Sequence, residues 1–198
     1  MRSLSKKLLI AGIALLLTTF AEAQKSQKRN SDYVITPKGD TMICIIAIPM
    51  LGKNTYTTMF DTTQVLKPDE IKEYYIRSKN EHYRSVVRPG ETKPVFLKML
   101  ETGGINLYED LISNTSMDNY KAAWYITKGP DKLIELRENK LSPGKGQKND
   151  LEKMLMDNND VYDAYLHDTK FTFDEARSYI HLYNTGVWQQ GWGKTYEH

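Results

Sequence analysis

Apolar and polar positions alternate along the first part of the chain and recur at helical spacing along the second. From Asp32 to about Arg137, turn residues interrupt the sequence roughly every 8 to 12 positions, and the segments between them are rich in β-branched and aromatic residues. This pattern predicts a series of short strands. We expect them at residues 32–36, 41–48, 55–60, 73–77, 82–88, 95–101, 105–109, 122–128 and 132–137.

Short turn sequences join several of the predicted strands. Tight hairpin loops favour glycine and proline, and all three of these turns contain glycine, two of them with proline. They are Pro37-Lys38-Gly39-Asp40, Gly129-Pro130-Asp131 and, without proline, Thr102-Gly103-Gly104. Sequential strands joined in this way form a mostly antiparallel sheet. Residues 67–71 (KPDEI) fit either one helical turn or a plain turn. Residues 41–48 are apolar on both alternations, so we expect that strand to be covered on both faces.

After residues 142–146 (SPGKG) the apolar period changes from that of a strand to that of a helix. Leu151, Met154 and Leu155 predict one short helix, and the apolar positions of residues 161–166 predict a second. Lys145-Gly146-Gln147-Lys148 lacks the spacing of a phosphate-binding loop, and we interpret it as a linker.

A further helix has the clearest end signals. Thr172 and Glu175 have the spacing of a capping box, and Gly186 suits a C-terminal cap. One apolar stripe runs along this helix, and we expect it to pack on the sheet rather than to hold a cofactor. The stripe consists of Phe173, Ala176, Ile180 and Tyr183.

Strands followed by helices predict the α+β class. We expect about 7–9 strands in a mostly antiparallel sheet, as a sandwich or a partly open barrel, with two or three C-terminal helices packed on it. The predicted organisation is a single domain over residues 32–186, with the sheet in 32–141 and the helices in 147–186. Residues 187–198 lose periodicity and are interpreted as a tail.

The first 23 residues have the layout of a secretory signal peptide. Arg2, Lys6 and Lys7 precede an apolar run over residues 8–20, and Ala21-Glu22-Ala23 matches an A-x-A cleavage site. We therefore expect cleavage between Ala23 and Gln24, leaving residues 24–31 as a flexible start of the mature chain. The apolar run is shorter than the roughly 20 residues of a transmembrane helix, so we expect no transmembrane segment after cleavage.

Removal of these residues changes the charge and leaves one thiol. The whole chain has 27 Lys and Arg against 25 Asp and Glu, and cleavage leaves 24 of each. Interspersed, balanced charge does not fit a nucleic-acid-binding protein. The single cysteine, Cys44, cannot form an internal disulfide, and its apolar neighbours favour a buried structural role.

Candidate catalytic residues are few. Glu81 with His82, and His167 with Asp168, place an imidazole beside a carboxylate in sequence, as general acid–base catalysis could use. Neighbours on a strand point to opposite faces, so Glu81 and His82 are expected to be surface residues. No pair of histidines has the spacing of a helical metal site, and Asp157-Asn158-Asn159-Asp160 lacks the glycine and glutamate of a calcium loop. We expect neither a metal nor another cofactor.

Aromatic residues are abundant, with 13 Tyr and 3 Trp. Tyr74 and Tyr75 fall in a predicted strand, where cross-strand packing explains them, and binding is the alternative. Trp188 and Trp192 lie outside periodic structure, where a tryptophan docks on the domain itself, a partner or a sugar. These four residues are the candidate binding residues.

Residues 33–42 (YVITPKGDTM) end in Gly39-Asp40-Thr41-Met42, which resembles the G-D-T-I hairpin of small exported proteins of the Bacteroidota type, most of them uncharacterised. The similarity continues through residues 67–72, 95–97, 107–108, 124–126, 133–136 and 183–184. The resemblance implies an accessory domain of the envelope or a secreted one, and it transfers no catalytic residue. Asp40-Thr41-Met42 and Asp61-Thr62-Thr63 also resemble the sites at which such bacteria O-glycosylate exported proteins.

These observations favour an exported, non-enzymatic accessory or binding module of the bacterial cell envelope. Its expected location is periplasmic, outer-membrane-associated or secreted, and its expected partner is an unknown envelope protein, glycan or lipid. The alternative is a small periplasmic hydrolase or metal-dependent enzyme assembled from the dispersed residues Glu81, His82, His167 and Asp168. A ligand carrier with a cavity between sheet and helices is a third hypothesis.

Overall fold

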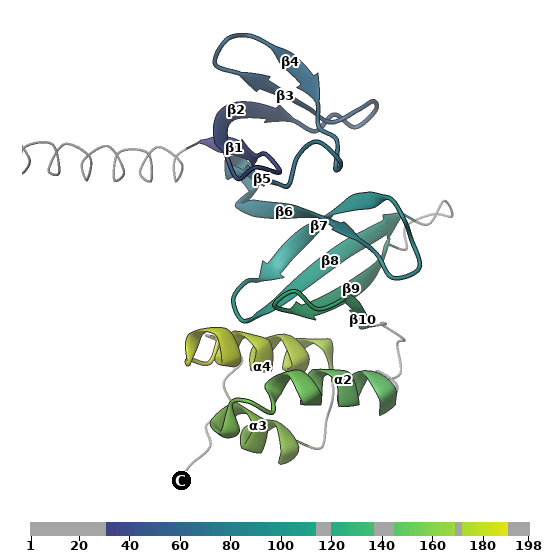
Figure 1. Cartoon of the computed structure of the whole chain (residues 1–198), viewed down its shortest axis with the longest axis vertical. Helices are drawn as coiled ribbons and strands as arrows, with labels where there is room; N and C mark the ends of the chain where they lie inside the picture. Colours follow the sequence, from purple (N-terminus) through teal and green to yellow (C-terminus); the bar gives the residue numbers. More distant parts are fainter. Residues whose placement is uncertain (1–30, 114–119, 137–144, 169–171, 190–198) are drawn as a thin grey trace, which may run out of the picture. The chain divides into compact units, whose positions relative to one another are not determined.

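The computed structural model of the chain describes residues 31–113, 120–136, 145–168 and 172–189 (Figure 1). Ten strands and three α-helices lie in these ranges, which confirms the predicted α+β fold with an antiparallel sheet followed by helices. The chain divides into two compact units, with the boundary between Glu81 and His82. The single domain of residues 32–186 stays a prediction, and the predicted signal peptide (residues 1–23) and residues 24–30 lie outside the described residues.

Unit 1, up to Glu81, is a small antiparallel sheet. Its strands are β1 (Asp32–Ile35), β2 (Thr41–Ala47), β3 (Thr55–Thr58), β4 (Thr63–Val65) and β5 (Glu73–Ile76), in the spatial order β5-β1-β2-β3-β4. The predicted turn at residues 37–40 closes the β1–β2 hairpin, with Gly39 at a φ of 93°. A short 3-10 turn, η1 (Arg77–Lys79), follows β5. The buried side chains are Tyr33, Val34, Cys44, Tyr56, Leu66, Ile71, Tyr74 and Ile76.

Two features of unit 1 differ from the sequence prediction. Strand β4 was not expected, because its three residues, Thr-Gln-Val, are too short and too polar to show a strand period; pairing with β3 forms it. Strand β2 is not covered on both faces. Cys44 is buried, whereas its neighbour Ile45 is 72% exposed. The ambiguous residues 67–71 form a turn in which Ile71 N–H donates to the Lys67 carbonyl at 2.9 Å.

Unit 2, from His82 onwards, contains the other five strands, of which the first begins one residue before the boundary. These are β6 (Glu81–Val87), β7 (Pro94–Glu101), β8 (Ile105–Ser113), β9 (Tyr120–Lys128) and β10 (Ile134–Leu136), ordered β6-β7-β8-β9-β10 with antiparallel neighbours. The register between β7 and β8 shifts between Met99 and Glu101, so that Glu101 lies opposite Leu107. This β-bulge places Leu100 and Glu101 on one face of the strand.

Three helices follow the sheet of unit 2. They are α2 (Lys145–Leu155), α3 (Asn159–Leu166) and α4 (Phe173–Thr185). The predicted linker at residues 145–148 is therefore wrong: α2 already begins at Lys145, because Leu151, Met154 and Leu155 anchor the helix and Lys and Gln extend it easily. The predicted capping box of Thr172 and Glu175 is present, and Gly186 caps α4 at a φ of 72°.

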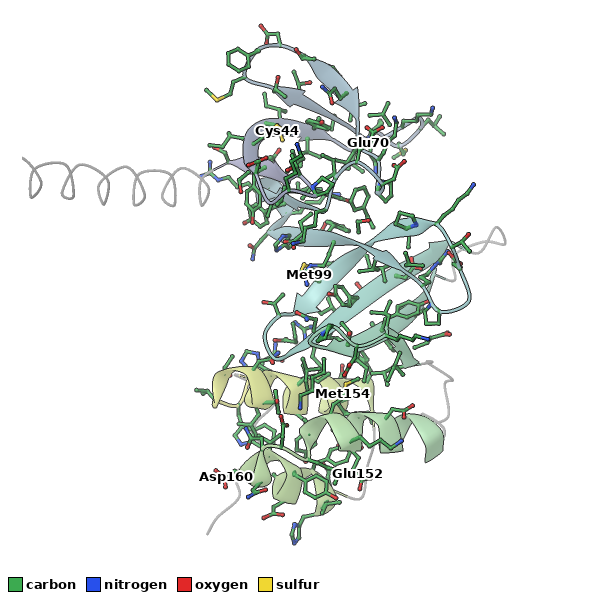
Figure 2. All side chains as sticks on the ribbon, viewed as in Figure 1. Cys44, Glu70, Met99, Glu152, Met154 and Asp160 are labelled. Carbon is green, nitrogen blue, oxygen red and sulfur yellow. The ribbon has the colours of Figure 1, made fainter. Side chains whose placement is uncertain are left out.

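The helices and one face of the sheet share a hydrophobic core. Met154, labelled in Figure 2, contributes to this core from α2. The predicted stripe of α4 packs in the same cluster, which confirms that it faces the sheet. The fully buried members are Ile105, Leu107, Ile126, Leu151, Leu155 and Ile180. A second cluster, formed by Leu97, Met99, Tyr108, Ala123 and Tyr125, lies on the other face.

Hydrogen bonds join the end of α4 to the start of β8, next to the turn between β7 and β8. Asn184 Oδ1 accepts from Ile105 N–H at 3.0 Å, and Asn184 Nδ2 donates to the Ile105 carbonyl at 2.7 Å. A Cβ atom on Gly103 would lie 2.6 Å from Asn184 Cγ, and one on Gly104 would lie 2.8 Å from Tyr183 Cε1. A larger residue at position 103 or 104 would collide with the side chains at the end of α4 unless these moved.

Candidate functional site

The first candidate is a set of exposed apolar side chains in unit 1. Ten large apolar side chains are exposed in the described part of the chain, and six of them lie between residues 45 and 60. We call these six the β2–β4 apolar surface: Ile45, Ile48, Met50, Leu51, Met59 and Phe60. Ile45 lies on β2, whereas the other five lie in the β2–β3 loop and the β3–β4 loop, at the two ends of β3. Exposed apolar side chains gathered in one small sheet make unit 1 a candidate for interaction with another molecule.

A shallow pocket of about 410 Å³ adjoins part of this surface. Ile43, Ile45 and Met59 supply its apolar walls, because the pairing of β2 with β3 places these positions near one another. The charged residues that line it are Asp32, Asp61 and Arg77. Apolar walls with a few polar groups are suited to orienting a bound group.

Asp32 holds the strands on which this pocket is built. Its Oδ2 accepts from Ile46 N–H at 3.0 Å and its Oδ1 accepts from Arg77 N–H at 2.8 Å. The carboxylate thus joins β2 to the end of β5 where β1 begins. Cys44, labelled in Figure 2, also lines the pocket, but burial raises the pKa of its thiol to about 12. A neutral thiol at physiological pH is a packing residue and not a nucleophile.

The second candidate lies in unit 2, where the β-bulge directs Glu101 towards α4. Glu101 Oε1 accepts from Arg177 Nε at 2.9 Å, and Glu101 Oε2 lies 2.8 Å from His181 Nδ1. Arg177 and His181 are four residues apart and therefore share one face of α4. The carboxylate side chain is only 10% exposed, whereas its two partners are partly open to solvent. A carboxylate that orients an imidazole in this way could support general base chemistry.

No family model, curated protein or solved structure matches the chain. Within the described ranges, no group of three or more His, Cys, Asp or Glu side chains could hold a metal ion. No described helix combines the length and the apolar character needed to cross a bilayer.

The candidate catalytic residues lie in different settings. His167 is exposed, and its Nδ1 lies 2.7 Å from the carbonyl oxygen of Asp163. Asp168 is buried and instead accepts a hydrogen bond from Tyr179 Oη at 3.1 Å. Glu81 and His82 are consecutive residues of β6, both half-buried, whose side chains leave opposite faces of the strand.

The described binding candidates have packing roles. Tyr74 is buried, and burial raises the pKa of its hydroxyl. Tyr75 stacks on Tyr33 with ring centroids 5.3 Å apart. Trp188 meets the edge of Tyr179 at 5.4 Å and packs against the core of unit 2. Trp192 lies outside the described residues.

The pattern that could have revealed the β2–β4 apolar surface was present in the sequence. Residues 41–48 are apolar on both alternations, and that was interpreted as a strand covered on both faces. The Glu101–His181 contact had no comparable signal, because 80 positions separate the two residues and the β-bulge cannot be seen in the sequence.

Proposed function

We propose that the protein is an exported, non-enzymatic binding module of the bacterial cell envelope, and that unit 1 carries the binding surface. The observation that supports this proposal is the β2–β4 apolar surface. Phe60 is 91% exposed and Ile45 is 72% exposed, so these side chains are positioned for contact with another molecule. The signal-like first 23 residues support export, and residues 33–42 support a relationship to exported proteins of the Bacteroidota type.

The arrangement of ionisable groups favours binding over catalysis. Charged side chains of the described residues form pairs with structural roles, such as Arg88 Nη1 with Asp110 Oδ2 at 2.7 Å and Lys128 Nζ with Asp157 Oδ1 at 2.6 Å. Cys44 is held neutral, and Asp32 binds backbone N–H groups. These groups stabilise the fold and do not converge with a nucleophile.

Site-specific photocrosslinking tests the binding proposal. Phe60 is replaced by the photoreactive analogue p-benzoylphenylalanine in the full chain, produced in a bacterium with an outer membrane. Irradiation should yield an adduct with an envelope component, because the side chain projects from unit 1. The matched control carries the same analogue at Val187, which is exposed in unit 2. Absence of an adduct at position 60, or equal adducts at both positions, would contradict the proposal.

Export is tested on the same material. The protein recovered from the envelope fraction should begin at Gln24 when its N-terminus is sequenced. Protein that stays in the cytoplasm with residues 1–23 intact would argue against an envelope role. Both results are independent of the crosslinking.

A small hydrolase is the second candidate, and the Glu101–His181 contact is the observation that favours it. In that case His181 would act as the base, oriented by Glu101 through Nδ1. Hydrolysis of an ester or peptide by the purified protein, abolished by His181→Gln and retained in His167→Gln, would establish this alternative. If the protein is a binding module, the unsubstituted protein should not hydrolyse such substrates.

A further inference from the structure

The β2–β3 loop (residues 48–54) presents apolar side chains with no surrounding protein. Met50 is 102% exposed and Leu51 is 90% exposed, and Ile48 at the start of the loop is also exposed. None of the residues that line the unit 1 pocket comes from this loop. At these exposures the side chains of Met50 and Leu51, which we call the tips, project into solvent.

The β2–β3 loop itself carries one charged side chain. Residues 41–60 contain no Asp or Glu, and their single charged side chain is Lys53, which is exposed beside the tips. An exposed apolar side chain beside a cation suits the surface of a bilayer with anionic lipid, where negatively charged headgroups border the apolar acyl chains.

The base of the loop is fixed. Ala47 pairs with Thr55 across the strand ends, and the Asn54 carbonyl accepts from Leu66 N–H at 2.8 Å. Gly52 adopts a φ of 111°, which turns the chain back towards β3. Because the strands are already paired, inserting the tips would require little ordering of the loop.

We propose that the β2–β3 loop inserts Met50 and Leu51 into the surface of a phospholipid bilayer that contains anionic lipid, with Lys53 at the level of the headgroups. This inference rests on the proposed function, because it names a bilayer as the envelope component. A fluid acyl phase accepts a protruding side chain without a matching cavity, whereas a folded protein partner must supply one. The same contact buries apolar area and places Lys53 near lipid phosphate.

A fluorophore at the tip tests the proposal in the full chain. Leu51→Cys is labelled with the polarity-sensitive probe NBD, and Val187→Cys, labelled in the same way, is the matched control. The native Cys44 should not react, because it is buried and its thiol is neutral. Vesicles of phosphatidylethanolamine with phosphatidylglycerol should shift the emission of the probe at position 51 to the blue. Lipids with a quencher on the acyl chain should quench it, while the probe at position 187 should be unaffected.

A second variant measures the affinity without a label. Met50→Asp with Leu51→Asp should lower the fraction that sediments with these vesicles by at least about tenfold, because two apolar anchors are lost and negative charge is added. All proteins carry Leu15→Glu and Leu16→Glu, which interrupt the apolar run of residues 8–20 and remove its own affinity for lipid.

The possible results separate the two proposals. Emission at position 51 that is unchanged by vesicles, or sedimentation that the double Asp variant does not reduce, overturns insertion into lipid. If the adduct at position 60 then persists and contains a protein, the binding module stands and its partner is that protein. If neither experiment gives a signal, both proposals fail.

Discussion

Replacing Asn184 by alanine removes both side-chain hydrogen bonds that join α4 to the start of β8. The backbone N–H and carbonyl of Ile105, a residue with 0% exposure, then lose their partners. Leaving one buried polar group without a partner costs about 1–3 kcal/mol. Because Asn184 is itself only partly buried and water can replace part of the loss, we expect Asn184→Ala to lower the free energy of unfolding of unit 2 by about 2–4 kcal/mol.

Urea denaturation followed by tryptophan fluorescence measures this change. The three tryptophans of the sequence, Trp124, Trp188 and Trp192, all belong to unit 2, so the signal reports on that unit. Asn106→Ala is the matched control. Its Oδ1 accepts only an exposed hydrogen bond of 3.4 Å from Gly103 N–H, and the expected loss is below about 0.5 kcal/mol.

A third variant tests the direction of the two hydrogen bonds. Asn184→Asp keeps an acceptor for Ile105 N–H but replaces the Nδ2 donor by an oxygen that faces the Ile105 carbonyl. We therefore expect Asn184→Asp to be at least as destabilising as Asn184→Ala at neutral pH. A loss below about 1 kcal/mol for Asn184→Ala, or equal losses for Asn184→Ala and Asn106→Ala, would refute the reasoning.

Two further predictions concern titratable groups. Because burial raises the pKa of Cys44 to about 12, iodoacetamide at pH 8 should leave the native thiol unmodified and should alkylate it in urea, as mass spectrometry can measure. Alkylation of the native protein at the rate of a free thiol would show that β2 opens. The Asp157 carboxyl has a pKa below its ordinary 3.8, mainly because of the hydrogen bond from Lys128. A lowered pKa stabilises the fold above the ordinary pKa, and this stabilisation disappears as the pH falls through the folded value. Asp157→Asn should therefore destabilise unit 2 at pH 7, and urea titrations at decreasing pH should show this effect disappear as the carboxyl of the folded protein becomes protonated. An effect that does not change with pH would mean that the carboxylate charge contributes nothing.

Local signals explain why much of the fold could be predicted. The Thr172 and Glu175 spacing gave the start of α4, and Gly186 gave its end, because capping depends on residues within one turn. The hairpin at residues 37–40 followed from proline and glycine in the same way. The beginning of α2 was missed because Lys145 and Gly146 carry no apolar period, and packing further along the helix determines it.

The candidate sites were harder to predict because they depend on tertiary structure. An apolar residue in a strand can face either the core or the solvent. Ile45 faces the solvent because no other part of the fold covers it, and the sequence does not show which segments pack on a strand. Glu101 reaches His181 because a β-bulge changes the face to which its side chain points. His167 and Asp168 are adjacent in sequence, yet after the end of α3 the His167 side chain is exposed to solvent and the Asp168 side chain is buried.

The Asn184–Ile105 contact also sets an order of events during synthesis. Strands β7 and β8 leave the ribosome long before α4, and the contact spans 79 positions of sequence. The apolar face of the sheet that α4 covers must therefore stay uncovered until the chain has been made as far as Thr185. Contacts between such distant positions slow folding. That apolar face therefore stays accessible for much of the time in which the unit is made.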